Sequence, residues 1–304
     1  MGGTWSPTSP PADPGFYVNF EALATATVTG GQTGVVLIPL HDAVWGPVGE
    51  TVELYSLAEY DRLYTNTDCG ARKAVAGAFT GAGYAPGAER VLAHRLGADA
   101  DGKDTSTKAQ ATVDGIDLEA KYGGEAGNDL TVTIDVVADT TNVIVEWDGV
   151  KVWEMEFTSG PEVGDQLAAV ENNWFKVTGG TYGATGSVGP VAFTGGGVHA
   201  TEDGMDYFTE SELLNNDYNV VTSYDETIGA EIAAATVAYN LEGKRFLAVI
   251  GGKVEDIDTA CAAAKGYDNE NVVRVGYTAL ETENGTITTA EFAPQLAGII
   301  AANG

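Results

Sequence analysis

Histidine is the side chain best suited to acid–base chemistry near neutral pH, and this sequence has three: His41, His94 and His199. Their positions do not have the spacing of metal ligands. His41 is followed by Asp42, but no Gly-x-Ser-x-Gly segment supplies a nucleophile for that pair. We therefore expect no catalytic residue and no metal site, and we expect the chain not to be an enzyme.

Two glycine-rich segments have the composition of phosphate-binding loops. Residues 81–87 follow a helical pattern and precede a strand, whereas a dinucleotide loop needs the strand first so that a helix N-terminus faces the phosphate. Residues 179–189 contain no lysine and precede no helix. The acidic segment 99–104 lacks the spacing and the bidentate glutamate of a calcium loop. We expect no cofactor.

The net charge of −29 at pH 7 excludes one class of partner. A nucleic-acid-binding surface needs a basic stripe, so we expect no nucleic-acid partner. The sequence also has no signal-peptide pattern and no apolar run long enough to cross a bilayer, so we expect no membrane partner and a soluble protein. Two cysteines, Cys69 and Cys261, do not make a disulfide framework.

Before residue 100 the hydrophobic pattern alternates between strand and helix. Residues 34–40 form a continuous apolar run that predicts a buried strand. Weaker patterns predict strands over 50–55 and 90–96. Ser56 and Asp68 are each placed to cap one of two helices between these strands.

Between residues 107 and 178 the pattern is mostly that of strands. Asp148-Gly149 separates two apolar runs and predicts a tight hairpin. A short helix is expected over 163–170. The strands are predicted over 107–113, 130–137, 142–147, 150–157 and 175–178.

From residue 204 the alternation returns. Ser223 and Glu226 have the spacing of a capping box at the start of a helix over 228–239. Cys261 lies on the apolar side of the next helical pattern and is expected to be a buried free thiol. Further elements are predicted over 205–214 (helix), 217–222, 245–250 and 271–275 (strands), and 292–302 (helix).

These patterns predict an α/β fold in three parts. A discontinuous α/β domain is expected from residues 21–100 plus 195–304. A β-rich, sandwich-like domain of residues 103–193 is inserted between its halves. Residues 1–20 are expected to be an extended N-terminal arm, because four prolines precede a short strand formed by Phe16, Tyr17, Val18, Asn19 and Phe20.

Gly127, Asn128 and Asp129 form a candidate structural turn. Asn and Asp tolerate left-handed backbone and can bond the backbone two residues further on. We expect this turn to begin the strand over 130–137.

Several segments, taken in order, carry a family resemblance. The most specific, residues 121–134, reads Lys-Tyr-Gly-Gly-Glu-Ala-Gly-Asn-Asp-Leu-Thr-Val-Thr-Ile. The others are Gly-Gly-Thr-Trp (2–5), Pro-Gly-Phe-Tyr-Val-Asn-Phe (14–20), Thr-Gly-Gly (194–196) with Asp-Gly (203–204), and Asp-Tyr-Asn-Val-Val (217–221). Together they resemble contractile phage tail sheath proteins, especially those of myovirus-like prophages. Asp13 stands where the family usually has an arginine.

The resemblance implies a virion structural protein. Such subunits would polymerise helically around a tail tube, as in other contractile injection systems, and contract to drive the tube into the host envelope. The implied partners are neighbouring sheath subunits, the tail tube protein, and the baseplate and tail terminator proteins. The implied location is the virion tail, assembled in the host cytoplasm, with Phe16–Phe20 as a strand-exchange arm between subunits.

One departure from the family concerns the end of the chain. In the family a further C-terminal domain follows the final helix, whereas this sequence stops at Gly304. We therefore expect a form without that domain.

Two other function classes fit parts of the pattern. One is an acidic α/β hydrolase-like enzyme with an inserted β domain, which would need a nucleophile or a metal cluster. The other is a surface- or carbohydrate-binding module that uses Trp147, Trp153 and Trp174, although such residues more often pack in cores.

Overall fold

The structure is a computed structural model of the 304-residue chain. It describes residues 34–82, 85–183, 185–197, 204–244, 246–252, 256–276, 280–282 and 285–303. All of these belong to one compact unit, Gln32–Gly304. The expected arm, including Phe16–Phe20, and His199 lie outside the described residues.

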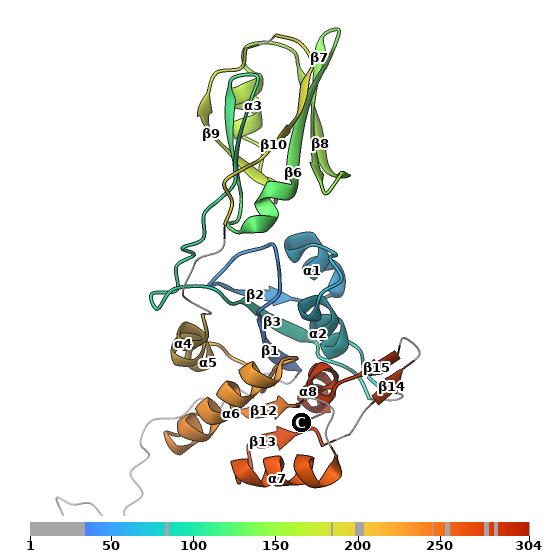
Figure 1. Cartoon of the computed structure of the whole chain (residues 1–304), viewed down its shortest axis with the longest axis vertical. Coiled ribbons are helices and arrows are strands. Elements are labelled where there is room, and N and C mark those ends of the chain that lie inside the picture. The colour runs from blue at the N-terminus through green and yellow to red at the C-terminus, as the bar shows by residue number, and fades with distance from the viewer. Residues whose placement is uncertain are drawn as a thin grey trace, which may run out of the picture. The chain divides into compact units, whose positions relative to one another are not determined.

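A six-stranded sheet is built from segments at both ends of the described chain (Figure 1). Five strands are parallel, and the edge strand β2 runs antiparallel to β3. All six side chains of β1 are buried, as the apolar run predicts. The order is β13 (Val272–Arg274), β12 (Leu247–Ile250), β11 (Val220–Thr222), β1 (Val35–Leu40), β3 (Arg90–Arg95) and β2 (Thr51–Leu54).

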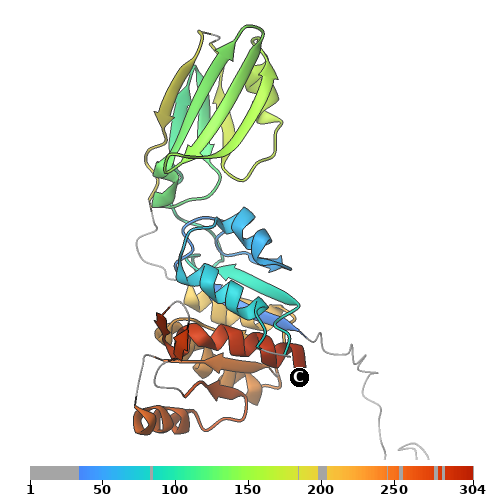
Figure 2. The ribbon, with the colours of Figure 1, turned by 90° about the vertical axis from the view of Figure 1, so that its right-hand side faces the viewer.

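Helices cover both faces of this sheet (Figures 1 and 2). On one face lie α1 (Leu57–Tyr64), α2 (Gly70–Phe79) and α8 (Thr289–Asn303). On the other lie α6 (Glu226–Leu241) and the segment 205–215, in which a π-helical turn, Phe208–Glu212, joins α4 (Met205–Tyr207) to α5 (Leu213–Asn215). Helix α7 (Ile257–Tyr267) contacts α6 and β13.

Helices α2 and α8 pack closely because small residues line their contact. Ala71, Ala74 and Ala78 of α2, and Ala293 and Ala297 of α8, are all buried. A Cβ on Gly298 would lie 2.0 Å from the Ala78 carbonyl oxygen, so no larger residue fits there.

The end of α8 also meets the start of the sheet. The Gly34 N–H donates to the Ala301 carbonyl at 2.7 Å. The first and last described parts of the α/β region are therefore neighbours.

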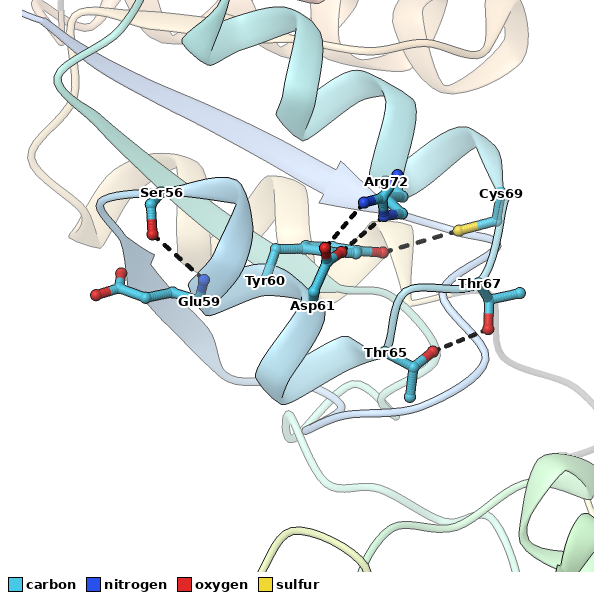
Figure 3. A network of polar contacts seen from close by, with 8 residues as sticks. All are labelled: Ser56, Glu59, Tyr60, Asp61, Thr65, Thr67, Cys69 and Arg72. Carbon is cyan, nitrogen blue, oxygen red and sulfur yellow. Dashed lines mark hydrogen bonds and ion pairs between the residues drawn. The ribbon is translucent and has the colours of Figure 1, made fainter. Parts of the chain in front are cut away.

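Polar contacts join α1 to α2 (Figure 3). The Arg72 guanidinium donates two hydrogen bonds to the Asp61 carboxylate, at 2.7 and 2.8 Å. Ser56 caps α1 as predicted, accepting from the Glu59 N–H at 3.3 Å. The prediction that Asp68 caps α2 is wrong, because the N-cap residue is Cys69 and Asp42, from the segment after β1, accepts from the first N–H groups of the helix.

Residues 110–192 form two sheets of their own. One has the order β10 (Val188–Ala192), β6 (Leu130–Val137), β7 (Thr140–Trp147), β8 (Val150–Thr158). The other has the order β4 (Gln110–Val113), β5 (Ile116–Ala120), β9 (Phe175–Gly180). With the short helix α3 (Val163–Ala168) they enclose one hydrophobic core. We call this part the β region and the rest the α/β region.

Two local predictions are wrong, and some elements were not predicted. The capping residue of α6 is Asp225, whose carboxylate accepts from Thr227 and Ile228, whereas the Ser223 hydroxyl bonds only the backbone of Asp225. Cys261 is exposed, because α7 lies at the periphery and buries Ala260 instead. Strand β5 was not predicted, nor was the hairpin of β14 (Leu280–Thr282) and β15 (Gly285–Ile287).

Candidate functional site

A cavity of about 450 Å³ lies at the carboxyl ends of β1 and β3 and beside the start of α6. Parallel α/β sheets usually bind ligands at this edge. Its lining includes His41, Asp42, Arg95, Glu125 and Glu231. An active site of the hydrolase-like alternative would be expected in this cavity, because it gathers acidic, basic and histidine side chains.

Asp42 is fully engaged in holding three segments together. Its carboxylate accepts from the N–H groups of Gly70 and Ala71 at 2.7 and 2.8 Å, and from the Tyr224 hydroxyl at 2.7 Å. The Tyr224 hydroxyl in turn accepts from the His41 N–H at 2.9 Å, and the His41 and Tyr224 rings stack at 4.6 Å. Burial is the main cause of a raised pKa of Tyr224, and the negative charge of Asp42 raises it further. The Tyr224 hydroxyl therefore keeps its proton and remains a donor. The His41–Asp42 pair therefore has a structural role, because it connects the segment after β1 to the start of α2 and to Tyr224.

The other polar groups of the cavity serve the loops around it. The Arg95 guanidinium donates to the carbonyls of Gly46 and Val44 at 2.6 and 3.2 Å. The hydroxyl of Ser106 donates to Asp104. Among the described residues no group of three or more His, Cys, Asp or Glu side chains is arranged to hold a metal ion. These contacts give the cavity a role in joining segments and supply no activated nucleophile.

Next to this cavity the chain leaves the α/β region and returns to it along paired segments. Thr107 and Gly197 exchange backbone hydrogen bonds at 2.9 and 3.2 Å. Gln110 and Thr194 do the same at 2.8 and 2.9 Å. We call these paired segments, with Asn128, the junction.

Asn128 fastens the two sides of the junction. Its side-chain amide donates to the Gly196 carbonyl at 2.9 Å, and its side-chain oxygen accepts from the Gly196 N–H at 2.8 Å. Two segments that carry the sequence resemblance, 121–134 and 194–196, therefore meet here. Gly127, Asn128 and Asp129 lie in a 3₁₀ helix, Glu125–Asp129, directly before β6. The two hydrogen bonds between the Asn128 side chain and Gly196 span 68 residues of the chain, whereas we expected a local turn.

Close approach explains two glycines of these segments. A Cβ on Gly196 would lie 2.5 Å from the Gly124 carbonyl oxygen. A Cβ on Gly127 would lie 3.0 Å from the Cβ of Ala109. Both positions therefore favour glycine for steric reasons.

A second attachment between the regions was not predicted from the sequence. Trp45, in the loop after β1, is completely buried in the core of the β region, and its indole N–H donates to the Asn173 carbonyl at 3.0 Å. The Asn173 amide donates to the carbonyls of Arg62 and Leu63 at 2.9 and 3.1 Å, at the end of α1. The Tyr122 hydroxyl donates to the Asn173 side-chain oxygen at 3.1 Å. We call these four contacts the Trp45 attachment.

The tryptophans considered for carbohydrate binding are packed. Trp147 and Trp174 lie 5.8 and 5.6 Å from the Trp45 ring, and Trp153 lies 5.1 Å from the Phe175 ring. All three pack against the core of the β region. The sequence signal that could have revealed the Trp45 attachment is Trp45 itself, a large aromatic residue in a loop rich in glycine and proline.

No protein-family profile matches the sequence. The uncharacterized protein YqbK of Bacillus subtilis is 28% identical over 151 residues, which are 47% of this chain and 28% of YqbK. Among solved structures, a sheath tail protein of Desulfitobacterium hafniense matches 95% of this chain with a TM-score of 0.62 and 22% identity. A sheath tail protein of Listeria innocua matches 90% with a TM-score of 0.60 and 17% identity.

The chain spans 62% and 57% of the lengths of these two structures. The match covers both the α/β region and the β region, since it leaves out at most a tenth of the chain. The chain has the fold of the solved tail sheath proteins.

Proposed function

We propose that this chain is a structural subunit of a contractile tail sheath, which polymerises around a tail tube and contracts to drive the tube into the host envelope. The observation that carries the proposal is the shared fold over 90–95% of the chain. The meeting of two resemblance-bearing segments at Asn128 and Gly196 supports it.

Contraction is a change between two packings of the same subunits, so each subunit needs a fixed shape and a compliant link to its neighbours. The two attachments between the α/β region and the β region suit the first need. For the second we propose the arm of Phe16–Phe20, which would add a strand to a neighbouring subunit.

The proposed partners are neighbouring sheath subunits, the tail tube protein, and the baseplate and tail terminator proteins, in a virion tail assembled in the host cytoplasm. The charge of −29 disfavours a nucleic-acid partner. No described helix is long and apolar enough to span a bilayer. A purely structural role, without catalysis, is supported by the cavity, whose Asp42, Arg95 and Ser106 side chains hold loops and helix ends.

Assembly is the direct test. If polymerisation needs the arm and the additional C-terminal domain of the family, residues 1–304 alone should stay small in analytical ultracentrifugation at low and high salt. A form extended by that domain should polymerise, and more readily as salt rises, because the Debye length falls from about 10 Å at 0.1 M to about 3 Å at 1 M. Electron micrographs should then show tubes. Tubes formed by residues 1–304 alone would disprove the account in which the arm needs the additional C-terminal domain as its partner.

We also propose the domain division 1–20, 21–100 plus 195–304, and 103–193. The separate sheets of residues 110–192 and the paired backbone at the junction support it. Residues 103–193 replaced by a short glycine linker, together with Trp45→Gln to avoid an exposed indole, should leave a folded α/β region. An aggregated or molten product would contradict the division.

A further inference from the structure

His94 is a fully buried histidine on β3, with none of its side chain exposed. Its Nδ1 lies 3.0 Å from the Thr51 hydroxyl oxygen on β2. That hydroxyl donates a hydrogen bond to the Glu212 carboxylate. Because the Thr51 hydrogen is used in this way, its oxygen must accept from His94, and the neutral ring carries its proton on Nδ1.

In the part of the chain that the structure describes, the other ring nitrogen of His94 has no acceptor for a second proton. Its Nε2 is buried and has no hydrogen-bond partner among the described residues. The rings of Phe208 and Tyr207 lie 5.3 and 6.1 Å from the His94 ring. Burial lowers the pKa of His94 to about 4, although Glu212, 3.6 Å from Nδ1, opposes this shift. The cost of burying the charged ring therefore exceeds its attraction to the carboxylate.

Glu212 fixes the segment 205–215 to this place. It is the last residue of the π-helical turn Phe208–Glu212, a form of backbone often found at functional sites. Its carboxylate accepts from Thr51 and from the Asn216 amide, the latter at 2.8 Å.

Other titratable groups surround the cluster. Glu53 of β2 and Arg90 of β3 form an ion pair at 3.0 Å, and both line a shallow cavity with Thr51 and Asp217. Tyr207 has its pKa raised by burial and by Glu212, so it remains neutral in mild acid.

We propose that His94, Thr51 and Glu212 form an acid-sensitive clasp, which holds the segment 205–215 against β2 and β3 near neutral pH and releases it in mildly acidic solution. Protonation of His94 acts against the closed form, because it adds a buried charge for which the described residues supply no acceptor at Nε2. The segment begins close to the residues that follow β3, since a Cβ on Gly204 would lie 2.4 Å from the Gly97 nitrogen.

The direction of the effect follows from the two states of His94. The opened state has an ordinary histidine pKa of about 6.5 and binds a proton that the closed state cannot hold until about pH 4. The clasp is thus at full strength above about pH 6.5 and weakens as the pH falls toward 4. Between pH 7 and pH 5 the opening equilibrium should rise about 20-fold.

Hydrogen exchange of the full chain at pH 7 and pH 5, corrected for the intrinsic effect of pH, tests the proposal. Amides of residues 205–216 and β2 should exchange about 20-fold faster at pH 5, while those of β12 serve as the internal reference. His94→Asn keeps an N–H group toward Thr51 but cannot titrate in this range. In that variant the acid-induced increase should disappear, whereas it should persist in His41→Gln, which changes an exposed histidine.

Equal corrected exchange of 205–216 at the two pH values in the unaltered chain would overturn the proposal. So would an acid-induced increase that survives in a folded His94→Asn protein. If that variant does not fold, the exchange of the unaltered chain decides, because a twofold or smaller change between pH 7 and pH 5 is far below the expected effect.

Discussion

The junction and the Trp45 attachment hold the same two regions together by different physical means. The junction uses backbone hydrogen bonds, one amide side chain and glycines that allow close approach. The Trp45 attachment buries a complete indole and adds bonds to the exposed end of α1. Apolar burial scales with area, whereas a hydrogen bond contributes modestly to net stability but strictly limits geometry. The junction therefore mainly sets the direction of the chain, and the Trp45 attachment mainly supplies stability.

Replacement of Trp45 should have the largest effect. Trp45→Ala should lower the free energy of unfolding by about 3–5 kcal/mol, because it leaves a cavity in a closed core. Urea unfolding followed by circular dichroism would measure this, and the two regions should then unfold in separate transitions. Tyr55→Ala, at a position that is 60% exposed, is the control and should change little. If Trp45→Ala lowered the free energy of unfolding by less than about 1 kcal/mol, the Trp45 attachment would not be the main source of stability between the two regions.

Asn173→Ala should have an intermediate effect. It removes the side-chain partner of three groups, the Arg62 and Leu63 carbonyls and the Tyr122 hydroxyl, and should cost about 2 kcal/mol. Trp45→Phe is a partial match, since it keeps one buried aromatic ring and removes the five-membered ring with its bond to the Asn173 carbonyl. It should cost about 2 kcal/mol in the same urea titration, because a small cavity is added to the lost bond. Equal losses for Trp45→Phe and Trp45→Ala would mean that burial contributes little.

Asn128→Ala should have the smallest effect on stability, about 1 kcal/mol, because it removes two hydrogen bonds to Gly196 and little apolar contact. Thermal melting would measure the loss. Asn128→Asp keeps the acceptor for the Gly196 N–H and should lose less. An unchanged melting temperature together with lost assembly would show instead that Asn128 contacts a partner.

The sequence predicts elements best where the signal is local. The apolar run of β1, the strand β6 and the Asp148-Gly149 hairpin, whose residues have φ of 49° and 72°, were all predicted. Asp114-Gly115 carries the same signal, with φ of 43° and 83°, and the strand after it was missed because its pattern is short and rich in charge.

Contacts between distant segments could not be predicted in the same way. Asp42 caps α2 from 28 residues away, and Asn128 binds Gly196 at a separation of 68. Contacts between residues so far apart produce no periodic pattern in the sequence. Cys261 shows the opposite error, because an apolar stripe predicts burial only if a neighbouring element covers it. The sequence thus singled out residues such as Asp42 and Asn128, but it did not show which residues they contact.

The bond between the Gly34 N–H and the Ala301 carbonyl has a mechanical consequence. A tension applied between these two points acts on one 2.7 Å hydrogen bond and on the contact between β1 and α8. The Gly34 carbonyl also accepts from the N–H groups of Glu89 and Arg90 at 2.9 and 3.1 Å, so part of the load passes to β3. Because β1 and β3 are parallel neighbours, this part acts as shear along their shared hydrogen-bond ladder, which resists force with several bonds at once.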